Sequence, residues 1–267
     1  MRRLTGVWVS VLLLAALAVP GAQTPSADEV ARRVDARDTG RDSRLEMTMR
    51  LFDRQGRVRE RTLVVQAMRG TDGKDREGDR MLVRFQSPAD IRGTGFLVWE
   101  PPDVDDERFL YLPALGRVRR IAGAETQESF VGSDLTYEDI GGRELDRYAY
   151  TLVTGPPTWT GPDGQAHPVW RLESRARAAD AAYPRVVSVV RQDLLMVVAA
   201  EIFNRRDERE KSYEVRALRQ FDGIWTATEV SMVNHLQRTR TELTVTAARY
   251  NIGLTAAAFT RRALETP

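Results

Sequence analysis

The sequence contains no cysteine and only two histidines among its 267 residues. Without cysteine there is no disulfide, no thiolate nucleophile and no thiolate ligand for zinc, so a hydrophobic core has to hold the fold together. His167 lies in a loop rich in proline and glycine, His235 lies in a late strand-like segment, and the chain has no Gly-x-Ser-x-Gly element. We therefore expect no catalytic residues, no metal and no cofactor, and a hydrolase is the least favoured functional class.

The chain also lacks an excess of charge. It has 40 lysine and arginine residues against 38 aspartate and glutamate residues, and without Arg2 and Arg3 the balance is 38 to 38. A near-neutral protein lacks the basic surface that nucleic acid binding requires, so we expect no nucleic acid partner. Lysine is nearly absent, because only Lys74 and Lys211 occur, and we interpret this preference for arginine as a composition bias.

The first residues contain no acidic side chain. Arg2 and Arg3 precede an apolar run from Val7 to Val19, and Pro20, Gly21 and Ala22 follow it. This order is typical of a secretory signal peptide, since the run is shorter than the about 20 residues of a membrane-spanning helix. An uncleaved anchor is the alternative. We predict a bacterial periplasmic protein with a signal peptide at 1–22, a flexible tail at 23–27 and one domain at 28–267.

No long apolar run follows the leader. Apolar and polar residues alternate instead along many short segments. Leu45, Met47, Met49 and Leu51 alternate with polar residues, which predicts a strand with one dry face. About eleven such segments follow one another, with hairpin-length turns and no βαβ alternation. They predict a mostly β protein built on one strongly curled antiparallel sheet. Arginine at alternating positions of many strands disfavours the alternative, a transmembrane barrel.

The segment "FVGSDLTYEDI" at 130–140 concentrates acids and aromatics. Its acidic part, "SDLTYED", has no glycine at the turn position and no ladder of alternating acids like that of a calcium loop. We interpret it as a short helical turn capped by Ser133 or Asp134, which forms a plug pinned by ion pairs. The residues assigned to this plug are Phe130, Ser133, Asp134, Tyr137, Glu138 and Asp139, and the candidate ion-pair partners are Arg117, Arg119 and Arg120.

Three segments together resemble a known family. "SPADIRGTGFLVWE", "RFLYLPALGRVRRIAG" and "SFVGSDLTYEDI", in this order, are similar to the LolA-like outer-membrane lipoprotein-sorting protein family, in the branch with the GSDLTYED-type motif. The resemblance extends from about Asp28 over most of the chain. It implies a single unclosed antiparallel β-barrel with short helices covering its mouth. It also implies a periplasmic carrier that binds lipid or lipoprotein acyl chains and moves them towards the outer membrane.

A curled sheet of this size can enclose an apolar ligand. An alternative function is an accessory subunit of an inner-membrane transporter of the resistance-nodulation-division type, and we expect a monomer. Two questions stay open: whether the cavity is empty or filled by side chains, and whether the arginine-rich hairpin holds lipid headgroups, a partner or only Glu138 and Asp139. The predicted cavity lining consists of Met47, Met49, Phe85, Phe96, Val98, Phe109 and Tyr111.

Overall fold

A computed structural model describes residues 24–70, 78–101, 104–142, 145–179, 181 and 183–265. The predicted signal peptide lies outside these residues. The first helix, α1 (Ala27–Asp35), is capped by Ser26, whose hydroxyl accepts a hydrogen bond from the backbone of Glu29. Among the described residues, no helix is long and apolar enough to cross a membrane.

Strands dominate the rest of the chain. They are β1 (Asp42–Phe52), β2 (Val58–Met68), β3 (Asp79–Ser87), β4 (Gly95–Glu100), β5 (Glu107–Leu112), β6 (Arg117–Ile121), β7 (Tyr148–Leu152), β8 (Thr158–Thr160), β9 (Ala166–Ala176), β10 (Arg185–Arg191), β11 (Met196–Phe203), β12 (Arg209–Phe221), β13 (Ile224–Asn234) and β14 (Thr239–Tyr250). The short helices are α2 (Tyr137–Gly141), α3 (Arg261–Glu265) and 3-10 turns at Pro113–Leu115, Gly123–Gln127, Phe130–Gly132, Leu145–Arg147 and Ala256–Phe259.

All strands belong to one antiparallel sheet. Its order is β6-β5-β4-β3-β2-β1-β14-β13-β12-β11-β10-β9-β7, and β8 pairs with β9. The first and last long strands meet in the middle of the sheet, where Met49 of β1 lies opposite Leu243 of β14. Register shifts at Glu46/Met47 and along β12 add the local bends that help to curl the sheet. The ends β6 and β7 do not pair with each other in this order, so the barrel is unclosed, as predicted.

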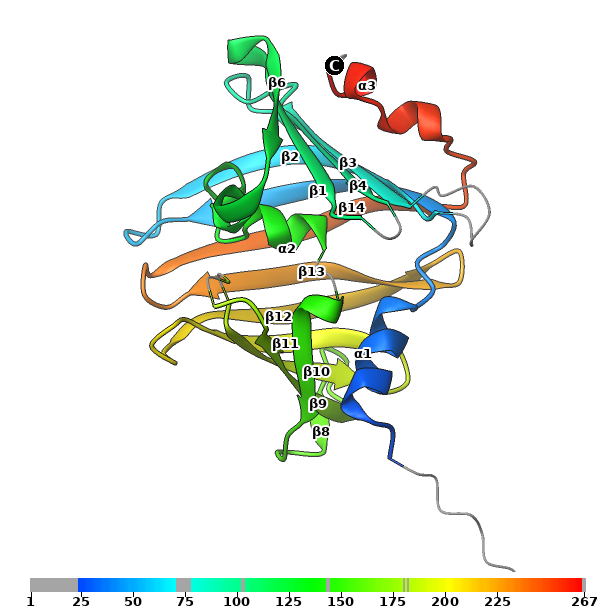
Figure 1. The fold of residues 1–267 in the computed structure, drawn as a ribbon, viewed down its shortest axis with the longest axis vertical. Helices are drawn as coiled ribbons and strands as arrows, with labels where there is room; N and C mark the ends of the chain where they lie inside the picture. The colour runs from blue at the N-terminus through cyan, green and yellow to red at the C-terminus, as the bar shows by residue number, and fades with distance from the viewer. Residues whose placement is uncertain are drawn as a thin grey trace, which may run out of the picture.

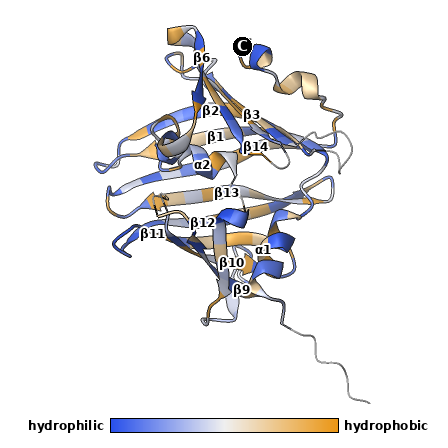
Figure 2. Ribbon diagram, viewed as in Figure 1, coloured by the Kyte–Doolittle hydropathy of each residue, from blue (hydrophilic) through white to orange (hydrophobic). Residues whose placement is uncertain are grey.

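The concave face of this sheet is apolar, and we call it the trough. Its buried side chains include Met49, Phe85, Phe96, Val98 and Leu110. Both hydrophobic and hydrophilic residues occur along β13 and β14 in Figure 2, as expected for strands with one dry and one wet face. The helix α2 lies across the trough in front of β13 and β14, and α1 lies beside β9 and β10 (Figure 1). Val30 and Ala31 of α1 are buried against Leu172 and Val190.

The C-terminal segment covers the opposite face of the sheet. Phe259 and Leu264 are fully buried there against Leu97 and Phe109. The indole nitrogen of Trp99 donates a hydrogen bond to the carbonyl of Phe259 at 2.7 Å. A Cβ at Gly95 would lie 2.6 Å from the Leu264 side chain, so a larger residue there would have to displace Leu264. These contacts fix the C-terminal segment on the outside of the half-barrel.

Two details differ from the sequence-based predictions. Within the described residues the sheet has 14 strands, not about eleven. One of them, β8, is a three-residue strand in the loop rich in proline and glycine, where turn signals mask it. The helical turn of the motif begins at Tyr137 and is capped by Thr136, so the predicted cap at Ser133 or Asp134 is wrong. Thr136 and Asp139 form a reciprocal capping box, which a Ser/Thr-x-x-Asp spacing allows and which we overlooked.

Candidate functional site

The candidate site is the trough together with residues 128–142, which we call the plug. The plug carries Phe130, Leu135 and Tyr137 into the trough, where all three are buried. Its rings form a connected aromatic cluster with those of the sheet. The ring of Phe130 lies 5.8 Å from Phe85 and 5.5 Å from Phe96, and the ring of Tyr137 lies 5.2 Å from Phe96. In this structure the plug therefore fills the middle of the trough.

Five of the predicted lining residues belong to the trough. Met49, Phe85, Phe96 and Val98 are at most 1% exposed, and Met47 is partly buried against the same cluster. Two predicted lining residues, Phe109 and Tyr111, pack on the opposite face under the C-terminal segment. On β5 it is the intervening Leu110 that belongs to the trough cluster. The alternation of residues gives β5 two faces. It does not predict that the C-terminal segment covers the outer face with a second apolar layer.

Asp134 anchors the plug to the sheet. Its carboxylate accepts hydrogen bonds from the hydroxyls of Thr239 and Thr241 on β14, the latter at 2.7 Å. Its backbone N–H donates to the Thr241 hydroxyl at 2.9 Å. Asp134 and Thr241 are both buried, so these bonds form out of water, where an unmade bond is costly. The plug is thus held by polar contacts as well as by apolar packing.

A second anchor is Lys211 of β12, which is only 7% exposed. Its ammonium group donates hydrogen bonds to the backbone carbonyl of Asp134 at 2.7 Å and to the hydroxyl of Tyr183 at 2.8 Å. That hydroxyl in turn lies 3.0 Å from a carboxylate oxygen of Asp139. The three residues connect β12, the segment before β10 and α2 in one buried network. Lysine suits this place because its compact ammonium offers three donors.

The third acid of the motif, Glu138, also has a partner in the sheet. Its carboxylate accepts a hydrogen bond from the hydroxyl of Tyr148 at 2.9 Å. Tyr148 begins β7, the last strand of the sheet. The predicted plug residues therefore do come together, and each acid is tied to a different strand or segment.

The hairpin arginines contact other groups. Arg119 forms an ion pair with Glu125 at 2.9 Å, Arg120 lies 3.9 Å from Glu107, and Arg117 is exposed. Arg119 also forms a side-chain hydrogen bond with Tyr137 of the plug. Burial raises the pKa of Tyr137, so this phenol stays protonated at neutral pH. Of the three predicted partners, Arg119 is the one for which we find a direct bond to the motif.

The plug contains a strained residue. Val131 has a φ of 49°, in the left-handed region that β-branched residues strongly avoid. Its carbonyl accepts a short hydrogen bond from the guanidinium of Arg61, a buried residue of β2. Strain of this kind persists only where surrounding contacts impose it, and it is frequent at sites that move or bind.

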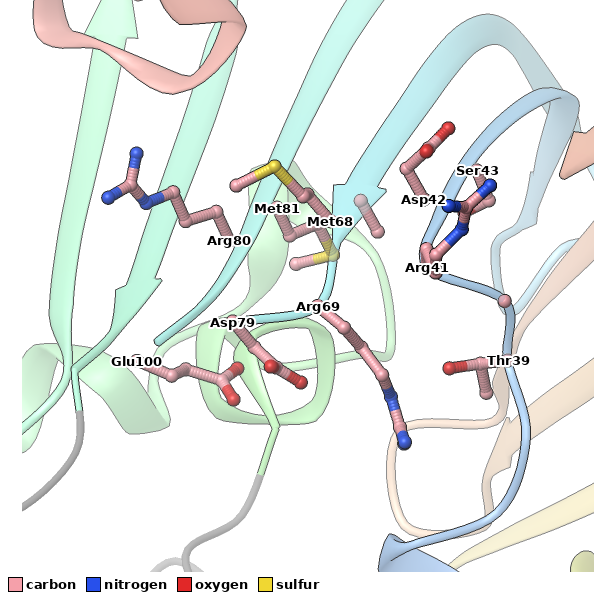
Figure 3. A pocket seen from close by; sticks show the side chains of 12 residues that line it. Thr39, Arg41, Asp42, Ser43, Met68, Arg69, Asp79, Arg80, Met81 and Glu100 are labelled. Carbon is pink, nitrogen blue, oxygen red and sulfur yellow. The ribbon is translucent and has the colours of Figure 1, made fainter. Parts of the chain in front are cut away.

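Two small pockets lie near opposite ends of β1. One pocket, of about 400 Å³, lies between the β1–β2 turn, the β13–β14 turn and the plug, and its lining includes Arg59, Lys211, Asn234, Gln237 and Thr239. The other, of about 180 Å³, lies near the C-terminal end of α1 (Figure 3).

The smaller pocket holds an acid with an unusual pKa. Burial, together with the carboxylates of Asp106 and Asp79, raises the pKa of Glu100 to about 7, although Arg108 opposes the shift. The side chains of Glu100 and Asp79 lie close together in Figure 3. A Cβ on Gly142 would lie 3.2 Å from the Glu100 carboxylate, so this acid also adjoins the end of the plug.

Few groups in the described part of the chain are arranged for catalysis. No group of three or more histidine, cysteine, aspartate or glutamate residues there could hold a metal ion. His235 lies 3.0 Å from the hydroxyl of Ser212, but among the described residues no carboxylate is hydrogen-bonded to its ring. Burial lowers the pKa of His235.

Sequence reasoning missed the residues that hold the plug from the sheet side: Arg61, Tyr183, Lys211, Thr239 and Thr241. One signal was present. Lys211 is one of two lysines among 40 basic residues, and we interpreted this as bias. At position 211 the compact ammonium of lysine bonds two buried oxygens, and arginine is not an equivalent replacement at such a place.

Comparisons with known proteins agree with this geometry. A family model described as that of an uncharacterized protein matches residues 77–266. A DUF1329 family protein from Desulfovibrio piger is 33% identical, with a TM-score of 0.78 over 89% of this chain and 97% of that one. A candidate outer membrane lipoprotein-sorting protein domain from Vibrio parahaemolyticus is 28% identical, with a TM-score of 0.77 over the same shares. No match was found among curated protein sequences.

A LolA superfamily protein from Nitrosomonas europaea has a TM-score of 0.66 over 90% of this chain and all of that one, at 16% identity, which supports the fold alone. The fold is thus that of the LolA superfamily, an unclosed antiparallel half-barrel with a covered concave face. The chain belongs to the DUF1329 family. The predicted resemblance and fold class are confirmed.

Proposed function

We propose that this protein is a periplasmic carrier that binds the acyl chains of a lipid or lipoprotein in its trough and moves them towards the outer membrane. The observation that carries the proposal is the plug: an apolar trough is covered in its middle by one short segment with polar anchors, not by a second sheet. The LolA-like fold supports a binding role. The similarity to the outer membrane lipoprotein-sorting protein domain from Vibrio parahaemolyticus supports the same role. The signal-like leader supports export.

The free energy of apolar burial is of the same order for the plug and for an acyl chain. Burial of Phe130, Leu135 and Tyr137 contributes on the order of 5–9 kcal/mol, at about 1.5–3 kcal/mol for each large side chain. A chain that buries about 14 methylene groups gains about 11 kcal/mol, at about 0.8 kcal/mol each. The difference of a few kcal/mol is comparable to the cost of association, so displacement of the plug's side chains also requires that the polar anchors find water or other partners when they separate.

The experiment is native mass spectrometry of the protein purified from a bacterial periplasm, followed by organic extraction and lipid identification. We expect a bound lipid at a defined stoichiometry, and uptake of a fluorescent fatty acid after the lipid is removed. A protein that is isolated empty and takes up no fatty acid contradicts the carrier proposal. In that case the accessory role at a membrane transporter becomes the better interpretation.

A further inference from the structure

The larger polar pocket lies at the end of the trough where the plug enters the sheet. Its volume is about 400 Å³, within the usual range for small-ligand sites. Leu51 lines this pocket and also belongs to the trough cluster, and Ser129 lines it directly before the buried Phe130. The pocket therefore adjoins the apolar trough.

The charges that line this pocket nearly cancel. The carboxylate of Asp53 is paired with Arg57 at 2.6 Å, and Asp134 and Lys211 are used in the plug anchors. The side chains of Arg59 and Glu210 form no hydrogen bond or ion pair with any described residue, which leaves one positive and one negative group. A ligand with a net charge would find no excess of opposite charge here.

The remaining lining is rich in hydroxyl and amide groups. The hydroxyls of Ser129 and Thr239 donate to Ser133 and Asp134, and each keeps oxygen lone pairs that can accept. Gln237 is exposed, and its amide offers both donors and an acceptor. An alcohol group donates one hydrogen bond and accepts others, so a ligand with several hydroxyls matches this mixture. Phe52 adds an apolar surface to the same pocket.

We propose that this pocket binds an uncharged, hydroxyl-rich group, a sugar or another polyol, which is the head of the lipid that the trough carries. The inference rests on the proposed carrier function, because it places the acyl chain in the trough and the head outside it. The same chemistry could come from a free saccharide, and the experiment separates the two sources.

The test measures dissociation constants by isothermal titration calorimetry of the delipidated protein below the micelle concentration. The probes are dodecyl maltoside, dodecylphosphocholine and dodecanoate, which share one chain length, and free maltose. We expect dodecyl maltoside to bind at least tenfold more tightly than the other three. We expect Gln237→Leu and Arg59→Met each to weaken its binding by about tenfold and to leave dodecanoate binding unchanged. Gln165→Leu, an exposed glutamine of the β8–β9 turn, is the matched control.

The other outcomes are distinct. If dodecanoate binds but dodecyl maltoside is no tighter, or Gln237→Leu has no effect on it, the head site is overturned and the carrier stands. If free maltose binds as tightly as dodecyl maltoside and depends on Gln237, the pocket is a saccharide site independent of the chain. Binding of maltose without dodecanoate keeps the polyol pocket and removes the carrier. If no probe binds, both proposals fail.

Discussion

The ammonium group of Lys211 lies 2.8 Å from the hydroxyl of Tyr183, and both side chains are buried beside the plug. This bond joins β12 to the segment before β10 at the point where the Asp134 carbonyl is also held. Any movement of the plug away from the sheet has to break this contact between Lys211 and Asp134. The network therefore contributes to the free energy of plug release, together with the apolar packing of the plug.

Lys211→Met tests this network. Methionine keeps an unbranched side chain, one atom shorter than that of lysine, and removes the ammonium donor. The buried Asp134 carbonyl loses this hydrogen bond, which costs about 1–3 kcal/mol. We expect a lower free energy of unfolding in urea and faster proteolysis within residues 128–142. Arg54→Met, in the exposed β1–β2 turn, is the control and should change neither. An equal free energy of unfolding for the two variants would show that the network does not stabilise the plug.

Val131→Gly tests the strain in the plug. The left-handed conformation costs about 1–2 kcal/mol for an ordinary residue and almost nothing for glycine. This gain offsets the lost packing and the larger backbone entropy of glycine, so we expect a change below about 0.5 kcal/mol. Val58→Gly, at an exposed position of β2, should cost about 1 kcal/mol because glycine is a poor strand residue. Urea unfolding of the two variants measures the difference, and an equal loss would argue against strain at Val131.

Glu100→Gln tests the acid at the other end of the trough. The pKa of Glu100 in the folded protein is about 7, above the ordinary 4.5. Below about pH 4.5 the carboxyl group is protonated in both the folded and unfolded states and costs the folded state nothing. As the pH rises through 7, ionisation of the buried group lowers the free energy of unfolding. We expect the variant to match the natural protein at pH 4.5 and to exceed it at pH 8 by up to about 3 kcal/mol. Thermal unfolding across this pH range measures the effect. The exposed Glu229→Gln is the control, and a pH-independent difference would contradict the prediction.

A reversible crosslink tests whether the plug has to move. The chain has no cysteine, so Asp134→Cys with Thr241→Cys introduces the only two thiols, at a pair whose side-chain oxygens lie 2.7 Å apart. We expect the oxidised protein to lose at least tenfold in fluorescent fatty acid uptake and the reduced protein to regain it.

The control crosslink is Thr62→Cys with Ser87→Cys, which joins β2 to β3 across another 2.7 Å contact outside the plug. It should leave uptake unchanged in both redox states. If the locked plug still permits full uptake, with the disulfide verified by mass, the acyl chain does not enter by displacing residues 128–142.

The sequence was sufficient for the strands and for the shared location of the motif residues. Period-two alternation identified β1 because one of its faces is buried and the other is polar. It did not separate Leu110 from Phe109, since both faces of β5 are covered by apolar groups. The partners of Asp134 were beyond reach, because Thr241 and Lys211 are 107 and 77 residues away in sequence and only the sheet order brings them together.

An unclosed sheet has two free edges, and each is a template on which a strand of another molecule can add. The edge strand β6 carries Arg117, Arg119 and Arg120, so a second copy that approached in register would meet like charge along its length. The opposite edge strand, β7, has only five residues, and α1 packs beside it through the cluster that includes Tyr150 and Leu152. The arginine-rich hairpin thus has a use that requires no ligand: it discourages aggregation of a fold that cannot close.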